Sequence, residues 1–182
     1  MGLIIVLAIV AIAGFLLVGI FNNITSLENR VANALSQIDV QLKKRGDLVP
    51  NLVNTVKGYA EHESGVFEAV TKARSMLQTA NTVEEKSAAS SALSGALRTV
   101  FAVAENYPEL KADTSFLNLQ SELSDLEGKV AYSRQFYNDT VLMYNNSITT
   151  IPGVFLAGPM NKTKKSMFEA SEGDRVVPEV TF

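Results

Sequence analysis

The chain contains no cysteine, no tryptophan and a single histidine, His62, among its 182 residues. Without cysteine it can form neither a disulfide framework nor a thiolate metal site. With one histidine it cannot supply the paired Glu-x-x-His motifs of a di-iron carboxylate bundle. A catalytic zinc ion normally takes three protein ligands, and no second histidine or cysteine is available here. The composition therefore favours a role that does not depend on thiol or transition-metal chemistry.

The chain also has no excess of positive charge. The formal net charge is −3, from 16 Lys and Arg against 19 Asp and Glu. A dedicated nucleic-acid-binding protein needs a surplus of Lys and Arg to neutralise phosphates, so we expect no nucleic-acid partner. The sequence contains no GxSxG, Walker, GxGxxG or HExxH motif. We therefore predict a protein that is not an enzyme, and we assign no catalytic, cofactor-binding or metal-ligating residue.

Charge is absent altogether from the start of the chain, where the first charged side chain is Glu28. Leu3–Phe21 is a run of nineteen residues without a charged or strongly polar side chain. As a helix it spans about 28 Å, close to the hydrocarbon thickness of a bilayer. A cleaved signal peptide would have a basic start, a shorter apolar run and a small-residue cleavage site. We therefore predict an uncleaved transmembrane anchor over residues 1–22, in contact with the lipid bilayer.

Positive side chains follow the apolar run and none precedes it. Arg30 comes first, and the cluster Lys43-Lys44-Arg45 follows. The positive-inside rule places such residues on the cytoplasmic side of a membrane. The sequence therefore favours a domain that faces the cytoplasm. We interpret Lys43-Lys44-Arg45 as the end of a helix, where cations complement the helix dipole.

Beyond the anchor, apolar residues recur every three or four positions almost to residue 150, which is typical of amphipathic helices. A first helix is predicted over residues 25–45. Thr25 with Glu28 fits a capping box at its start, unless the helix continues from the apolar run. We expect Gly46-Asp47 to end this helix. Asp47 would then cap a second helix that reaches about residue 79, with Pro50 tolerated in its first turn.

Two further helices follow. Thr82 with Glu85 forms another capping box and opens the third helix, which Asn106-Tyr107-Pro108 ends because the residue before proline avoids the α region. The fourth is predicted over residues 115–149, with Ile151-Pro152-Gly153 as its stop.

We see no credible strand, so the predicted fold is all-α. A transmembrane helix (1–22) precedes an antiparallel up-down bundle of about four long helices (23–151) and an irregular C-terminal tail (152–182). Three lysines in the tail, flanked by apolar residues, allow two interpretations. The tail either lies on an anionic membrane surface or packs back onto the bundle, and we favour the second.

His62 stands between two carboxylates in Glu61-His62-Glu63. With Glu105 these carboxylates offer an alternative, an all-oxygen Mg²⁺ or Ca²⁺ site in a metal-assisted hydrolase. The simpler interpretation makes His62 a polar residue at a helix boundary, and we prefer it.

Several segments resemble the signature of the bacterial LemA family. They are Ser36–Arg45, Asp47–Val53, Val56–Glu63, Ala104–Lys111, Phe116–Gln120, Arg134–Asp139, Tyr144-Asn145, Ile151-Pro152 and Phe168–Ala170. One departure is Gly158-Pro159-Met160-Asn161, where the family usually has Gly-Phe before its lysines. The resemblance implies a single-span protein of the bacterial inner membrane with an antiparallel helical bundle. It supplies no catalytic residues, and it implies a setting in envelope stress or membrane quality control.

The leading hypothesis is therefore a non-enzymatic, membrane-anchored helical scaffold or adaptor that self-assembles as a homo-oligomer. The alternative is a module that binds another membrane or envelope protein, such as a TPM-domain protein or a membrane protease. Polar signature residues would form either a buried network that fixes helix register or an exposed interface. These candidates are Gln37, Asp39, Asn51, His62, Asn106, Tyr107, Asn138 and Asn145.

Overall fold

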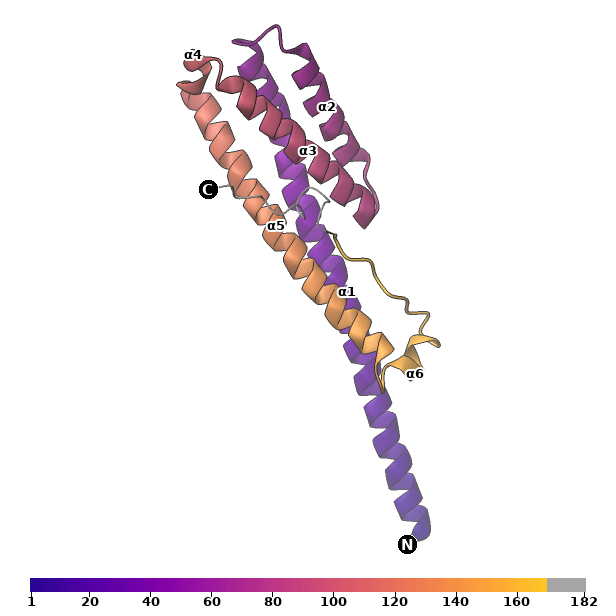
Figure 1. Ribbon diagram of the computed structural model, residues 1–182. Helices are drawn as coiled ribbons and strands as arrows, with labels where there is room; N and C mark the ends of the chain where they lie inside the picture. The colour runs from indigo at the N-terminus through magenta and orange to yellow at the C-terminus, as the bar shows by residue number, and fades with distance from the viewer. Residues whose placement is uncertain (170–182) are drawn as a thin grey trace, which may run out of the picture. The chain divides into compact units, whose positions relative to one another are not determined.

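The computed structural model describes residues 1–169 and contains six helices over that range, without a strand (Figure 1). The helices are α1 (Gly2–Lys57), α2 (Ser64–Thr79), α3 (Val83–Ala104), α4 (Pro108–Lys111), α5 (Thr114–Thr149) and α6 (Val154–Ala157). The predicted all-α class is confirmed. The part of the predicted tail from residue 170 to residue 182, including Ala170 of the family signature, lies outside the described residues.

The chain divides into two compact units. Unit 1 contains Met1–Ser36 and Gln135–Met167, and unit 2 contains Gln37–Arg134 with the described residues Phe168 and Glu169. The helices α1 and α5 each contribute one part to either unit. The predicted boundaries at residues 22 and 151 stay predictions, because packing units do not test where a membrane anchor ends.

The helix α1 continues through Gly46, Asp47 and Pro50, so the predicted break there is wrong. Proline lacks the N–H that would bond to the carbonyl four residues earlier. That carbonyl belongs to Gly46, and it accepts a hydrogen bond from Arg74 Nε of α2 at 2.9 Å. A neighbouring helix therefore satisfies the group that Pro50 leaves unpaired.

Neither Thr25 nor Asp47 caps a helix, because α1 is continuous through both positions. Asp47 lies inside α1, and α2 begins at Ser64 after a turn over residues 58–63. Thr25 does not cap a helix either, because its hydroxyl donates to the Phe21 carbonyl at 2.9 Å within the continuous helix. The other open possibility, a helix that continues from the apolar run, is the observed one.

The later boundaries agree with the sequence. Thr82 and Glu85 form the predicted capping box, with the Glu85 N–H donating to Thr82 Oγ1 and the Thr82 N–H donating to the Glu85 carboxylate, each at 3.1 Å. The helix α3 ends at Ala104, before Asn106-Tyr107-Pro108, and Pro108 opens the one-turn helix α4. The helix α5 covers the range predicted for the fourth helix.

The core of unit 2 lies between one face each of α1, α2, α3 and α5, with α2 alongside α3 (Figure 1). Phe101 and Phe116 meet edge to face, with ring centroids 6.2 Å apart. Burying each large aliphatic side chain contributes about 1.5–3 kcal/mol relative to exposure. The most buried members include Val49, Leu52, Val56, Val70, Leu93, Val100, Leu110 and Leu123.

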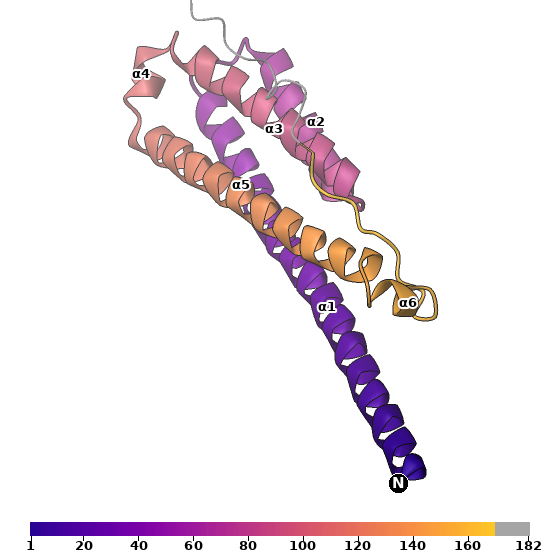
Figure 2. The ribbon, with the colours of Figure 1, turned by 60° about the horizontal axis from the view of Figure 1, so that its bottom comes forward.

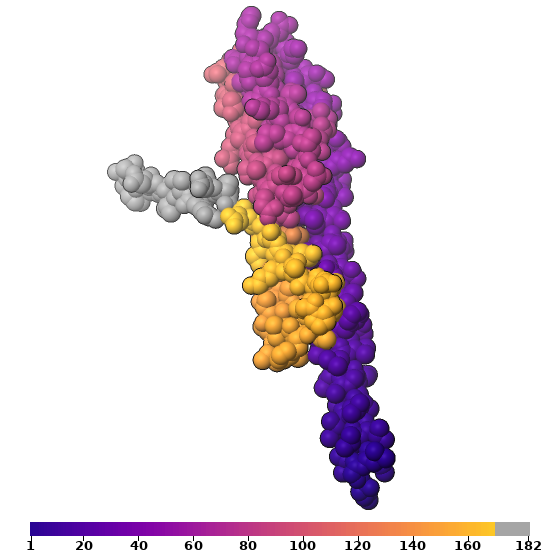
Figure 3. Space-filling view, turned by 90° about the vertical axis from the view of Figure 1, so that its right-hand side faces the viewer, coloured from indigo at the N-terminus to yellow at the C-terminus, as the bar shows by residue number. Residues whose placement is uncertain are grey.

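Unit 1 consists of the first part of α1, the last part of α5, α6 and the segment that follows. Residues 158–167 have no regular structure and lie along α5 (Figures 2 and 3). Its buried apolar side chains include Ile24, Val31, Tyr137, Val141, Tyr144 and Ile148.

The first turns of α1 extend past α6 without other residues around them (Figure 1). Their most apolar 18-residue window has a mean hydropathy of 3.2, and no residue in it is buried. Among the described helices, α1 is the one that is long and apolar enough to cross a membrane.

Candidate functional site

Of the six candidate residues in unit 2, four are exposed and two are half-buried. Asp39 is half-buried and accepts an ion-pair contact from Lys86 Nζ of α3 at 2.5 Å. Tyr107 is half-buried and packs against the core. The other four have exposed side chains, on α1 (Gln37 and Asn51), in the turn before α2 (His62) and before α4 (Asn106).

Asn145 of unit 1 fixes the segment that follows α6. Its Nδ2 donates to the Lys165 carbonyl at 3.0 Å, and its Oδ1 accepts from the Lys165 N–H at 2.9 Å. Tyr137 donates its hydroxyl to the Ser166 carbonyl at 3.0 Å. Asn138 is half-buried on the same helix. Lys165 and Ser166 of the tail therefore pack onto α5.

An ion pair joins the same segment to α1. Lys162 Nζ lies 2.5 Å from Glu28 Oε2, and Lys165 Nζ lies 3.7 Å from Glu28 Oε1. The hydrogen bond from Lys162 holds the pKa of Glu28 below its usual range, although partial burial opposes the shift. The same bond raises the pKa of Lys162. Both groups therefore stay charged near neutral pH and clamp the segment to α1.

Tyr144 lies beside this ion pair and is fully buried. Its hydroxyl makes no hydrogen bond to any described residue. Burial raises the pKa of Tyr144, and the Glu28 carboxylate raises it further. The side chain thus serves mainly as apolar volume in the unit 1 core.

Unit 2 has a polar centre that the sequence analysis missed. Arg45 is 3% exposed and forms an ion pair with Glu127 of α5, and its Nη1 lies 3.1 Å from Ser94 Oγ of α3. Burial lowers the pKa of Arg45, the Glu127 carboxylate opposes this, and the nearby Arg134 guanidinium adds to the lowering. Three helices therefore meet at one buried cation.

The interpretation of Lys43-Lys44-Arg45 as a helix end is wrong, because all three lie inside α1. Lys43 and Lys44 are exposed, but Arg45 follows Ile38 and Leu42 at the spacing of the buried face. That spacing was the signal for a buried cation, and the predicted break at Gly46 concealed it. Arg134 likewise contributes to packing, with its guanidinium 5.4 Å from the centroid of the Phe168 ring.

The carboxylates around His62 do not converge. Glu61 and His62 are exposed in the turn, and Glu105 forms an ion pair with Lys111. Over residues 1–169 no three His, Asp or Glu side chains lie close enough to hold a metal ion. The nearby Tyr59 hydroxyl instead donates to Asp113 at 3.2 Å. The Phe116 N–H bonds to the same carboxylate and, as the main cause, lowers the pKa of Asp113.

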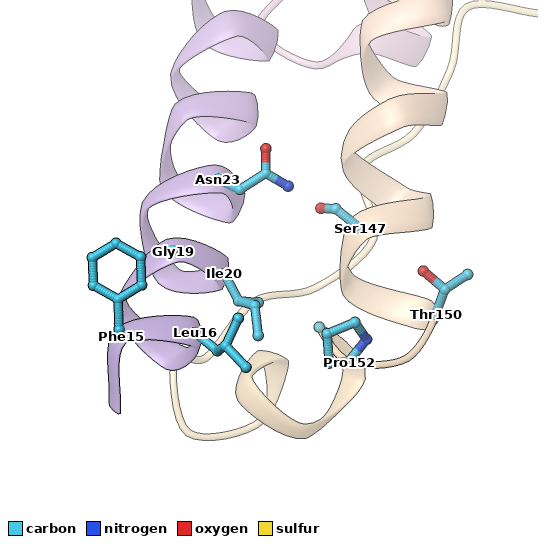
Figure 4. Close-up of a pocket in the computed structure, with 9 residues that line it drawn as sticks. Phe15, Leu16, Gly19, Ile20, Asn23, Ser147, Thr150 and Pro152 are labelled. Carbon is cyan, nitrogen blue, oxygen red and sulfur yellow. The ribbon is translucent and has the colours of Figure 1, made fainter. Parts of the chain in front are cut away.

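Each unit has a surface hollow whose lining residues are candidates for binding. In unit 2, the α1–α5 groove is lined by Gln37, Gln41, Asp125, Gly128, Lys129, Tyr132 and Ser133. In unit 1, a mostly apolar hollow separates α1 from the end of α5 (Figure 4). Phe15, Leu16, Gly19, Ile20 and Asn23 line one side, and Ser147, Thr150, Pro152 and Gly153 line the other.

Comparison with known proteins agrees with the signature in the sequence. Residues 34–182 match the family model described as the LemA family. Protein LemA of Metamycoplasma hominis is 29% identical over 167 residues, which cover 89% of this chain and 74% of that protein. The apolar start of α1 precedes the residues matched by the family model. Because the match spans well over half of the sequence, this chain belongs to the LemA family.

Proposed function

We propose that this chain is a non-enzymatic, membrane-anchored helical scaffold or adaptor that self-assembles as a homo-oligomer. The anchor crosses the bacterial inner membrane once, and the bundle faces the cytoplasm. The observation that carries this proposal is α1, one continuous helix of 56 residues. Its first turns are apolar and fully uncovered, and its later turns supply Val49, Leu52 and Val56 to the core of unit 2.

The titratable groups support a structural role over a catalytic one. Strongly shifted pKa values mark candidate catalytic groups when they line a cleft. Here Glu28 and Lys162 pair with each other, Arg45 pairs with Glu127, and Asp113 and Glu85 accept backbone N–H bonds at helix starts. None of them lines the hollows of either unit described above. Their shifts therefore follow from packing and capping.

The α1–α5 groove of unit 2 is the surface that we propose for self-assembly. Tyr132 is 72% exposed at its edge, and Val40, which precedes the lining residue Gln41 on α1, is 50% exposed. Exposed aromatic residues are enriched at protein interfaces. Asp125 and Lys129 carry opposite charges one turn apart on α5, so two copies related by a twofold axis would place each charge near its opposite. The candidate Gln37 belongs to this surface.

Measuring the mass of the full chain in mild detergent tests the proposal. We expect a homo-oligomer that Lys129→Glu dissociates and that the double variant Asp125→Lys/Lys129→Glu restores, because the swap renews the complementary charges. Leu117→Ala, at an exposed apolar position elsewhere on α5, serves as the control and should leave the mass unchanged. A uniformly monomeric wild-type chain would contradict self-assembly. A stoichiometric foreign chain after purification from the native host would instead favour the hetero-binding alternative.

The orientation has its own test, because the chain contains no cysteine. Asn51→Cys places a thiol on an exposed position of α1 in unit 2. We expect a membrane-impermeant maleimide to label it only after cells are opened. Labelling in intact spheroplasts would place the bundle on the outer side of the membrane.

A further inference from the structure

Large apolar side chains are exposed where α5 turns into α6. We call residues 149–158 the α5–α6 corner. Ile151 is 77% exposed, Phe155 is 70% exposed and Val154 is 42% exposed. Such a group of uncovered side chains in water is unfavourable and usually marks a contact surface. The question is what covers the corner.

The corner lies beside the apolar run of α1, which indicates that the bilayer covers it. Thr150, Pro152 and Gly153 face Leu16, Gly19 and Ile20 of α1 across the apolar hollow (Figure 4). Leu16 lies five residues before Phe21, the last residue of the apolar run, which is about 8 Å along a helix. A bilayer that surrounds the apolar run therefore reaches the corner too. That depth matches the roughly 5–10 Å at which interfacial apolar segments lie.

Unpaired backbone polar groups are costly in the apolar part of a bilayer. The corner has few of them. Pro152 has no N–H, and the N–H groups of Val154 and Phe155 bond to the carbonyls of Thr150 and Pro152 at 2.9 and 3.2 Å. The N–H groups of Leu156 and Ala157 both bond to the Gly153 carbonyl, at 2.9 and 3.0 Å.

Hydroxyl groups near the corner are paired in the same way. Thr149 and Thr150 donate their hydroxyls to the carbonyls of Asn145 and Asn146, and Ser147 donates to Tyr144. Serine and threonine in membrane helices commonly bond back to the preceding turn in this manner. These hydroxyls and the four N–H groups of residues 154–157 therefore have partners within the protein.

Positive charge gathers at the level where lipid headgroups would lie. Glu28 is seven residues after Phe21, about 10 Å further along α1, and it holds Lys162 and Lys165 at that level. Lys164 between them is exposed. Unit 1 has four cationic side chains, Arg30 and these three lysines, against the two carboxylates Glu28 and Asp139. Such an excess favours anionic headgroups.

We infer that the α5–α6 corner inserts into the bilayer interface beside α1, as a second membrane contact of this protein. Ile151, Val154 and Phe155 enter the boundary between acyl chains and headgroups, and the lysine segment lies at the headgroups. This inference rests on the proposed transmembrane anchor. It gives unit 1 a fixed orientation at the membrane surface, which a single spanning helix does not provide.

Depth-dependent fluorescence quenching tests the inference on the full chain in phosphatidylcholine vesicles. Because the chain lacks cysteine, a single environment-sensitive label can be attached to Phe155→Cys, to Phe15→Cys within the anchor, or to Met143→Cys. Met143 is the matched control, since it is an exposed apolar residue of unit 1 that lies two turns before the corner on α5. The quencher is a nitroxide carried on the lipid acyl chains.

We expect the label at Phe155→Cys to be quenched about as strongly as at Phe15→Cys, and several-fold more strongly than at Met143→Cys. Quenching at Phe15→Cys without quenching at Phe155→Cys would overturn the inference and leave the anchor intact. Absence of quenching at both positions would overturn the anchor and the inference together. A Phe155→Cys signal no greater than that of Met143→Cys would likewise refute insertion of the corner.

Discussion

Each unit contains a charged group that forms an ion pair among packed helices, but the two pairs differ in burial. In unit 2 the cation Arg45 is 3% exposed and is held by residues of two other helices. In unit 1 the Glu28 side chain is 29% exposed, and its partner Lys162 lies on a segment without regular structure. A buried charge that loses its partner cannot be solvated by water, so breaking the pair is costly. When a partly exposed pair is broken, water solvates both charges and the cost is small. Burial, and not the number of ion pairs, sets what each contact contributes.

The largest effect is expected from Glu127→Ala in unit 2. The substitution leaves the buried Arg45 guanidinium without its carboxylate and next to the positive charge of Arg134. Breaking a buried pair from one side costs about 3–5 kcal/mol, and the partial exposure of Glu127 places this case near the lower value. Urea unfolding of the full chain in mild detergent, followed by circular dichroism, measures the loss.

The matched variant Arg45→Met removes the cation instead. An apolar side chain then fills the buried site, and the remaining Glu127 carboxylate, which is 46% exposed, is hydrated. We expect a loss of less than about 1.5 kcal/mol, as for other volume-conserving changes. If Arg45→Met destabilised the protein more than Glu127→Ala, burial of the cation would not be the reason for the difference.

The next effect tests unit 1 at the end of α5. A Cβ on Gly153 would lie 1.8 Å from the Ser147 carbonyl oxygen, so Gly153→Ala forces the backbone of the corner to move. We expect a loss of about 1–3 kcal/mol, typical of overpacking. Faster hydrogen exchange of the amides of residues 154–157 would show that the loss of stability is at the corner.

Gly158→Ala is the control for this change. A Cβ on Gly158 meets nothing within 4 Å, and the residue has ordinary helical dihedral angles. It should be neutral or stabilising by about 0.4–1 kcal/mol, because alanine reduces the freedom of the unfolded chain. Equal losses at both glycines would argue against the clash with Ser147.

A smaller effect is expected from Asn145→Ala. An irregular segment needs partners for its backbone groups, and Asn145 supplies two of them to Lys165. Losing both bonds costs about 1–2 kcal/mol, which raises the open population of the segment by roughly 5- to 30-fold. Trypsin cleavage after Lys162, Lys164 and Lys165 should accelerate accordingly. Asn146→Ala, at the exposed neighbouring position, should cleave at the wild-type rate.

The sequence predicted those elements whose causes are local. The capping box of Thr82 and Glu85 and the break before Pro108 depend on neighbours within a few residues, and both are confirmed. The predicted break at Gly46 is wrong because the residue that keeps the helix continuous there is far away in the sequence. Arg74, 28 residues away, supplies the hydrogen bond that makes Pro50 tolerable inside α1.

The candidate site shows the same limit. Asn145 was selected as a polar signature residue, but its partner Lys165 could not be read from spacing. The ion pair between Glu28 and Lys162 joins positions 134 residues apart, and no local pattern indicates it. Arg45 was within reach, because it continues the apolar spacing of α1 at a position that a continuous helix would bury.

The smallest effect is the pH dependence of the Glu28–Lys162 pair. The pKa of Glu28 is lower in the folded chain than its ordinary value of 4.5, chiefly because Lys162 donates to it. A lowered carboxylate pKa stabilises the fold above the unfolded value, and this contribution disappears as the pH falls through the folded pKa. We expect Glu28→Gln to melt below the wild type at neutral pH and to match it once the pH is well under 4.5. Because the pair is partly exposed, added salt should narrow the neutral-pH difference, while the Glu127→Ala effect in unit 2 should change little. A Glu28→Gln difference that persisted at low pH, or that ignored salt, would mean that Glu28 acts through packing, and the contrast between the two units would then lose its electrostatic basis.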